Sequence, residues 1–326
     1  MNSNEVFPAI KNVIRTLLSK LPRVIFSCFF LSWALGHFGS WYWRFEMASN
    51  FQLQYLFGSL AFGALFAAMK QWRWLSAALC CALISVISVV PWYFSKASAW
   101  SQTSPHKLRL LLSNVYARNS RHSALVDLVR QEKPDLVFVQ EVTRQWADAL
   151  ERLRGEYPHG VILEGGVASL SRQSLLKAGD AGTGDYNGPG AEVQLSVGPR
   201  VLHIINVHTP APIGKHGLHL RNEHLDVIAD RMNNLPNPKI LIGDLNITMW
   251  SPYYRKFIER TGLINTREGF GVLPTWPTYY RSSALMIPID HCLVSEDIRV
   301  INIRTEAHIG SDHLPLIVDL EIPARR

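Results

Sequence analysis

The sequence is poor in cysteine, with four residues in a chain of 326, and their positions exclude two kinds of site. Cys28, Cys80 and Cys81 lie inside long apolar runs, and Cys292 stands alone in the last two thirds of the chain. A disulfide framework or a thiolate zinc site needs several cysteines grouped at short spacings. The sequence therefore predicts neither a disulfide framework nor a thiolate metal site.

Acidic residues are almost missing from residues 1–100, which contain only Glu5 and Glu46. Eight of the 33 Lys and Arg residues lie in the same segment, so its net charge is +6. The rest of the chain has 25 basic and 24 acidic residues, a net charge of +1. The formal charge of +7 thus belongs to the N-terminal third, and it does not indicate a nucleic-acid-binding surface on the remainder.

Charge is missing altogether from three runs, at residues 24–43, 51–69 and 74–94. Each has about 20 residues, and a helix of that length rises about 30 Å, the thickness of a hydrocarbon core. Tryptophans gather at the ends of the runs, as at membrane interfaces: Trp41, Trp43, Trp72, Trp74 and Trp92. A buried bundle explains this clustering poorly, and a cleaved signal peptide explains only the first run. We interpret residues 1–95 as a membrane anchor with three transmembrane helices.

Basic residues flank these runs unequally. Four precede the first run and two lie between the second and third: Lys11, Arg15, Lys20, Arg23, Lys70 and Arg73. The loop between the first and second runs has only Arg44, offset by Glu46. The positive-inside rule places the N-terminus in the cytoplasm. Three crossings of a plasma or inner membrane then place the C-terminal domain on the extracytoplasmic side.

After a polar linker at residues 96–106, short apolar runs mix with amphipathic segments over residues 107–326. The predicted strands lie at 108–115, 135–140, 201–207, 239–243, 289–295, 300–305 and 314–322. The predicted helices lie at 123–131, 143–154, 221–233 and 252–261, and a glycine-rich loop at 178–190. Strands and helices do not alternate strictly, which favours an α+β or sandwich architecture.

Polar side chains follow the apolar runs at six places, where a sheet presents catalytic groups. They are Asn114, Glu141, His208, the Asp244 and Asn246 pair, the Asp290 and His291 pair, and the Asp312 and His313 pair. Singly, each has a structural explanation as a turn, a solvated strand end or a cap. Six such places in one domain instead predict an active site.

A series of motifs carries a resemblance to a known family. They are SNVYARN (113–119), PDLVFVQEV (134–142), GGVASLSR (165–172), INVHTPAP (205–212), LIGDLN (241–246), PTWP (274–277), PIDHCLVS (288–295) and GSDHLPLIVDL (310–320). In this order they resemble the endonuclease/exonuclease/phosphatase superfamily over residues 107–322. The resemblance implies a four-layer α/β/β/α sandwich with the active site at one edge of the paired sheets. It also implies hydrolysis of phosphoester bonds by metal-assisted attack of water.

The resemblance assigns three residues to a metal site. Glu141 resembles the metal-binding glutamate of the family, Asn114 the asparagine that supports it, and Asp312 an acidic residue close to the metal. Carboxylate oxygens suit Mg²⁺, which keeps most of its waters and takes one or two protein carboxylates. The implied cofactor is Mg²⁺, with Mn²⁺ as an alternative.

The catalytic roles also follow from the resemblance. Asp244 would orient or deprotonate the attacking water, and Asn246 would steady the phosphoryl oxygens. His313 would contact the phosphate with Asp290 as its carboxylate partner, and His208 would touch the phosphate or help the leaving group. By contrast, we interpret His291 as a strand residue, Trp250 and Trp276 as packing residues, and His216, His219 and His224 as solvated faces of a loop and helix.

The sequence leaves the substrate open. Residues 107–322 contain no basic, aromatic-interleaved stretch that would follow a nucleic-acid backbone. A membrane tether raises the local concentration of substrates in the bilayer surface, which favours a lipid-linked or small phosphoester. DNA or RNA is the alternative substrate. A catalytically inactive, membrane-bound scaffold is the alternative from another class, although every polar position of the family is filled here.

Overall fold

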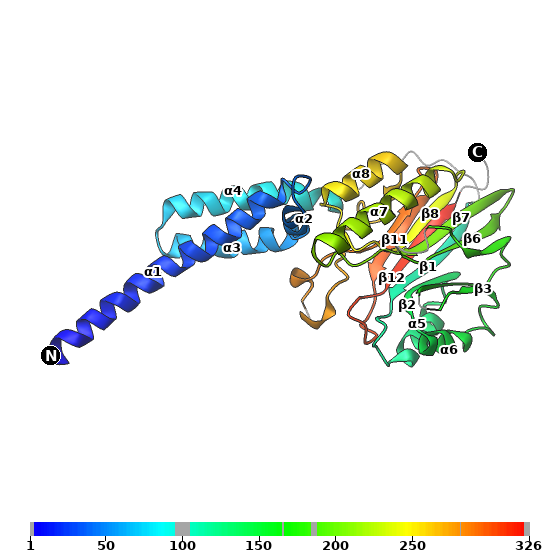
Figure 1. Cartoon of the computed structure of the whole chain (residues 1–326), viewed down its shortest axis with the longest axis horizontal. Helices are drawn as coiled ribbons and strands as arrows, with labels where there is room; N and C mark the ends of the chain where they lie inside the picture. Colours follow the sequence, from blue (N-terminus) through cyan, green and yellow to red (C-terminus); the bar gives the residue numbers. More distant parts are fainter. Residues whose placement is uncertain (1–2, 95–104, 165, 184–187, 281, 323–326) are drawn as a thin grey trace. The chain divides into compact units, whose positions relative to one another are not determined.

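The computed structural model describes residues 3–94, 105–164, 166–183, 188–280 and 282–322, with backbone alone for 3–19 (Figure 1). It divides into two compact units, Met1–Val89 and Val90–Arg326. Most of the predicted linker at 96–106 lies outside the described residues, and His106 already belongs to the first strand.

The N-terminal unit is helical. Its helices are α1 (Ser3–Gly36), α2 (Trp43–Ser49), α3 (Gln52–Ala68) and α4 (Trp72–Val89). Aromatic side chains form much of its interior, where the rings of Phe26 and Phe66 meet edge to face with centroids 5.3 Å apart. The hydroxyl groups of Ser32 and Tyr55 are 2.7 Å apart, which satisfies the hydrogen-bonding needs of two polar groups within the helical unit.

The described residues do not support three spanning helices. One helical stretch, Trp72–Tyr93, is long and apolar enough to cross a membrane, and α2 with α3 makes a second only if their 70° bend lies within one span. α1 ends at Gly36, so its uncharged part from residue 24 has 13 residues and rises about 20 Å, less than a bilayer core. The first uncharged run, 24–43, therefore extends well beyond the end of the straight helix within it.

Two mixed sheets form the C-terminal unit, each with six strands among the described residues. The first has the order β11-β12-β1-β2-β4-β3. Its strands are β1 (His106–Asn114), β2 (Leu136–Val142), β3 (His159–Ile162), β4 (Gly166–Ser171), β11 (Arg299–Thr305) and β12 (Leu316–Ile322). Within this sheet β1 and β2 are parallel, and β12 pairs antiparallel to β1.

The second sheet has the order β5-β6-β7-β8-β10-β9. Its strands are β5 (Lys177–Asp180), β6 (Gly190–Val197), β7 (Arg200–His208), β8 (Lys239–Asp244), β9 (Ile264–Asn265) and β10 (Asp290–Val294). Within it β7 and β8 are parallel, and β10 runs antiparallel to β8. The edge strand β5 overlaps the glycine-rich segment that was predicted as a loop. The strand was not predicted because it is defined by its pairing with β6 and not by a side-chain pattern.

The two sheets pack face to face, with helices on their outer faces (Figure 1). Side chains of both sheets build the core between them, among them Leu110 and Phe138 from one sheet and Ile204 and Ile242 from the other. The outer face of the first sheet packs on α5 (His122–Glu132) and α6 (Arg144–Glu151). The second is flanked by α7 (Gly214–Asn233) and α8 (Pro252–Thr261). The sandwich predicted from the sequence is confirmed.

Candidate active site

Parallel strands in each sheet bring the predicted residues to strand ends. Asn114 is the last residue of β1, and His208 and Asp244 end β7 and β8, where they are paired in register. Asp290 begins β10 directly opposite Asp244, because these two strands are antiparallel. Glu141 lies one residue before the end of β2. Side chains on neighbouring strand ends are within reach of one another.

Glu141 is placed by a β-bulge. The register of β2 with β4 shifts between Gln140 and Val142, and Glu141 has a positive φ of 59°. A bulge re-aims one side chain out of the strand's alternation, often next to an active site. The Glu141 carboxylate accepts hydrogen bonds from Asn114 Nδ2 at 3.0 Å and from the Ala117 amide at 2.8 Å. Its two oxygens are therefore held at the sheet edge while the residue keeps partial exposure.

Asn114 joins the two halves of the site. Its Nδ2 donates to Glu141 of its own sheet and, also at 3.0 Å, to Asp244 Oδ2 of the other sheet. Its Oδ1 accepts from the Tyr116 amide at 3.0 Å, which fixes the orientation of the amide group. The backbone carbonyl of Asn114 accepts from Ser311 Oγ at 2.7 Å. A single buried asparagine thus couples both sheets to the loop that carries His313.

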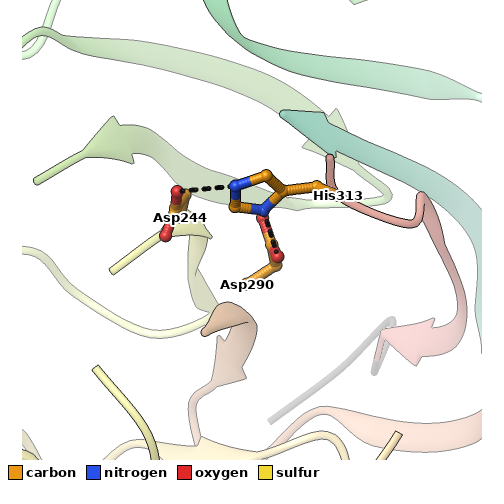
Figure 2. A group of neighbouring side chains, drawn as sticks. All are labelled: Asp244, Asp290 and His313. Atoms are coloured by element: carbon orange, nitrogen blue, oxygen red, sulfur yellow. Dashed lines mark hydrogen bonds and ion pairs between the residues drawn. The ribbon is translucent and has the colours of Figure 1, made fainter. Parts of the chain in front are cut away.

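His313 lies between two buried carboxylates (Figure 2). Its Nδ1 is 2.8 Å from Asp290 Oδ2, and its Nε2 is 3.7 Å from Asp244 Oδ2. All three residues are at most 4% exposed. The bond to Asp290 fixes the ring and directs Nε2 toward Asp244, and contact of His313 with a phosphate remains a prediction.

Burial and charge shift the titration of these groups. Burial and the negative charge of Asp290 raise the pKa of Asp244 to about 7, although His313 opposes this shift. Burial alone would lower the pKa of His313, but the carboxylates of Asp290 and Asp244 raise it to about 9. Burial likewise opposes ionisation of Asp290, yet the charge and hydrogen bond of His313 lower its pKa. At neutral pH the site therefore contains an imidazolium beside a carboxylate poised to exchange a proton.

His208 joins the same cluster. Its Nε2 lies 3.6 Å from Asp244 Oδ2. Burial lowers the pKa of His208, and the positive charge of His313 acts in the same direction, against the carboxylates of Glu141 and Asp290. A neutral His208 can accept or donate a hydrogen bond at a substrate oxygen.

The Asn246 side chain is committed to the protein backbone. The side-chain Nδ2 donates to the Thr209 carbonyl at 2.8 Å. The backbone amide of Asn246 donates to Asp244 Oδ1 at 2.8 Å, and its backbone carbonyl accepts from Arg221 Nη1 at 3.0 Å. Asn246 also has a positive φ of 48°, which asparagine tolerates better than most residues. These contacts position Asp244, and contact with the phosphoryl oxygens remains a prediction.

The two carboxylate oxygens of Asp312 differ in their hydrogen bonding. Its Oδ2 accepts from Trp276 Nε1 at 3.1 Å. Its Oδ1 is buried and has no hydrogen-bond partner among the described residues. A buried carboxylate oxygen without a donor fits a cation ligand, since burial without a partner is costly. Trp276 is therefore more than the packing residue we expected, because its indole orients an acidic group of the site.

One group of side chains among the described residues is close enough together to hold a divalent cation, and the sequence resemblance suggests another. Asp244, Asp290 and His313 bring three possible ligand atoms within 4.8 Å of one another. However, the neighbouring carboxylates raise the pKa of His313 to about 9, so a metal at this place would have to displace its proton. The chemistry of Glu141 and Asp312, two carboxylates outside that triad, fits Mg²⁺ better. The hydrogen bonds of Glu141 and Asp312 go to other groups, and joint binding of one cation by these two carboxylates remains a prediction.

Sequence reasoning missed the residues that support the site. Ser311 donates to the Asn114 carbonyl and accepts from the His313 amide at 3.0 Å. Gln140 Nε2 donates to Asn206 Oδ1 at 2.6 Å, a buried bond between the two sheets one residue before Glu141. Both asparagine and glutamine stand within the quoted motifs, but only the packing of the sheets shows that they meet.

The fold and this site define a hydrolase of phosphoester bonds. The sequence profile of the Endonuclease/Exonuclease/phosphatase family matches residues 111–313, and the chain belongs to that family. No curated protein sequence matches the chain.

Several solved structures share the fold at low identity. An endonuclease/exonuclease/phosphatase family protein from Bacteroides thetaiotaomicron is 20% identical, with a TM-score of 0.57 over 68% of this chain and 99% of that chain. The mannosyl-6-phosphatase of the same species is 20% identical, with a TM-score of 0.54 over 65% and 99%. D. rerio TDP2 in complex with a single-strand DNA product is 16% identical, with a TM-score of 0.53 over 66% and 98%.

Proposed function

We propose that this protein is a membrane-anchored, divalent-metal-dependent phosphoesterase. The observation that carries the proposal is the linked cluster at the sheet edge, in which Asn114 joins Glu141 to Asp244 and His313 lies between Asp244 and Asp290. Every group needed to bind a phosphate, activate water and hold a cation is present in it. This completeness favours an enzyme over an inactive scaffold.

Each residue of the site is assigned one part of the reaction. Asp244, with a pKa of about 7, accepts a proton from the attacking water near neutral pH. The His313 imidazolium offers Nε2–H to a phosphoryl oxygen and stabilises the charge that develops there. His208 and Asn246 flank Asp244 and orient the phosphate. A divalent cation held by Glu141 and Asp312 would supply further positive charge to the phosphoryl group.

Membrane attachment is supported by the helical unit. Large apolar side chains point outward from α1, α3 and α4, among them Val24, Leu31, Leu60, Leu83 and Ile87. Exposed apolar surface of this extent is typical of a surface that contacts lipid. We propose that α4 crosses a plasma or inner membrane, that the remaining helices lie in or on it, and that the catalytic unit is extracytoplasmic.

The orientation has a direct test. The basic residues at 11–23 and 70–73 are expected to lie on the cytoplasmic side, which puts the catalytic unit on the opposite side of the membrane. Protease added outside intact cells or spheroplasts is therefore expected to digest the catalytic unit. Immunoblotting of the C-terminus measures the digestion, and permeabilised membranes give the reference for complete digestion. Protection in intact cells with digestion after permeabilisation would place the unit in the cytoplasm.

The substrate is proposed to be a lipid-linked or small phosphoester. Full-length protein in lipid vesicles is expected to hydrolyse a phospholipid headgroup ester at least several-fold faster than the isolated 106–326 fragment, because the anchor raises the local substrate concentration. Equal amounts of both forms are assayed with Mg²⁺ against lipid vesicles, a sugar phosphate and plasmid DNA. The sugar phosphate is the matched control, since tethering should not change its rate. Efficient DNA cleavage by the isolated fragment, with no lipid turnover by either form, would favour the nuclease alternative.

A further inference from the structure

Exposed apolar side chains gather in two segments of the C-terminal unit. Six of the eleven large apolar side chains that are exposed in the described part of this unit fall within residues 90–94 and 279–285, and the other five are scattered singly along the sequence. The six are Val90, Tyr93, Phe94, Tyr279, Tyr280 and Leu285. Single exposed apolar residues are normal on a protein surface, whereas a cluster marks a surface that contacts a partner or lipid.

A turn of the same unit links the two segments. The Trp92 carbonyl, in the first segment, accepts hydrogen bonds from the amides of Gly269 and Gly271, at 3.0 and 2.9 Å. Gly271 has a φ of 100°, and a Cβ atom there would lie 2.6 Å from the Tyr93 ring, so glycine lets the ring pack against the turn. Trp276, which begins the loop with the second segment, follows Gly271 by five residues, and five residues reach at most about 18 Å. The two segments therefore belong to one region of the unit.

The second segment lies in a short loop. Trp276 and Ile287 pair as an isolated β-bridge, which closes the base of the loop between them. Beyond this base the rings of Tyr279 and Tyr280 have centroids 5.1 Å apart, and both side chains are more than half exposed. Arg281 is the one charged residue in the sequence of the loop. Exposed tyrosines with a single basic residue and no acidic one fit the headgroup zone of a bilayer.

The base of this loop contacts the active site. Trp276 Nε1 donates to Asp312 Oδ2 at 3.1 Å, and the Trp276 ring centroid lies 6.5 Å from that of His313. Thr278 donates from its amide to the Asp312 carbonyl at 2.9 Å and from its hydroxyl to the Ser311 carbonyl at 2.8 Å. The exposed aromatic pair begins at the next residue. The apolar surface is therefore joined by direct contacts to the segment that carries His313.

We propose that these two segments form a lipid-contacting surface of the catalytic unit, with the bilayer surface as its partner. The choice of lipid rests on the chain itself, because the helical stretch long and apolar enough to cross a membrane, Trp72–Tyr93, ends inside the first segment. A chain that leaves the bilayer at Tyr93 places the exposed rings of both segments at the level of the headgroups. The loop then brings headgroup phosphates close to the active-site cluster. The inference rests on the proposed membrane attachment and names the surface that presents the substrate.

A kinetic comparison tests the proposal. In full-length protein in phosphatidylethanolamine and phosphatidylglycerol vesicles with Mg²⁺, the combined change of Tyr279→Ser, Tyr280→Ser and Leu285→Ser is expected to lower hydrolysis of a phospholipid headgroup ester about tenfold, because lipid contact scales with buried apolar area. Hydrolysis of a soluble nitrophenyl phosphodiester should stay close to the wild-type rate. Leu176→Ser with Ile301→Ser, two exposed apolar residues of other segments, is the matched control and should leave both rates unchanged. Equal losses on both substrates, or no loss on the lipid, would overturn the proposal, and a loss confined to single-stranded DNA would instead assign the tyrosines to base stacking.

A second measurement does not depend on turnover. A nitroxide label at Tyr280→Cys, in full-length protein with the exposed cysteines changed by Cys28→Ser and Cys80→Ser, collides with oxygen in lipid and with a nickel chelate in water. In the same vesicles the chelate should reach this label several-fold less than a label at Leu176→Cys. Equal access to both labels would overturn the proposal even if lipid hydrolysis falls in the serine variant. A shielded label in a protein that hydrolyses no phosphoester would retain the lipid contact and reject the proposed function. If the serine variant does not fold, the two labels alone decide the proposal.

Discussion

Replacing Asp244 by Asn is expected to lower kcat by on the order of 100- to 1000-fold without unfolding the protein. The asparagine keeps the size of the side chain and an oxygen for the Asn246 amide, which lies 2.8 Å from Asp244 Oδ1. It removes the one carboxylate of the triad whose pKa, about 7, suits proton transfer at neutral pH. Single-turnover assays with the full chain measure the loss, and circular dichroism confirms the fold.

The dependence of activity on pH is a second test of Asp244 as the general base. Asp244 acts in its ionised form, so activity should fall as pH decreases through about 7. His313 acts as the imidazolium, so activity should fall again as pH rises through about 9. The residual activity of Asp244→Asn should lose the acidic limb and keep an alkaline limb at lower pH, because the Asp244 carboxylate helps to raise the pKa of His313. Asp127→Asn on the exposed face of α5 is the matched control and should match the wild type. A rate for Asp244→Asn within threefold of the wild type would exclude Asp244 as the base.

The sequence placed the candidate residues at strand ends but could not show which of them meet. Asn114 and Asp244 are 130 positions apart, and their 3.0 Å hydrogen bond depends on how the two sheets stack. No pattern in either motif encodes that contact. Strand ends were predictable because an apolar run followed by a polar residue is a local signal, whereas stacking is a property of the whole sandwich.

The predictions that the structure corrected also failed because they depended on contacts that a local pattern does not show. Strand β5 exists only through pairing with β6, so a segment of glycines gave no local sign of it. Helix α7 begins at Gly214, seven residues before the predicted start, and so takes in His216 and His219. The buried His224, expected on a solvated face, instead packs in the interior beside Gly188. For the N-terminal unit, an uncharged run marks apolar composition but not where a helix ends, as Gly36 shows.

Hydrolysis is expected to stop in excess chelator, and Glu141→Gln is expected to raise the Mg²⁺ concentration for half-maximal activity at least tenfold. Glu141 presents two carboxylate oxygens that accept from Asn114 and Ala117, both neutral donors, so its negative charge is left for a cation. The glutamine removes this charge, and it also turns an NH₂ group toward one of these donors. Losing a carboxylate ligand weakens a hard-cation site more than the 10- to 100-fold typical of its supporting residues.

Metal binding can be separated from catalysis in this test. Mg²⁺ or Mn²⁺ should raise the unfolding temperature of the wild type, because a ligand that binds only the folded state stabilises it, and this rise should be smaller in Glu141→Gln. Glu151→Gln, on the exposed face of α6 where Glu151 pairs with Arg154, is the matched control and should respond as the wild type does. Full wild-type activity in excess chelator would remove the cation from the mechanism. Asp244 and His313 would then have to act as base and electrostatic stabiliser alone, and the unpaired oxygen of Asp312 would need another partner.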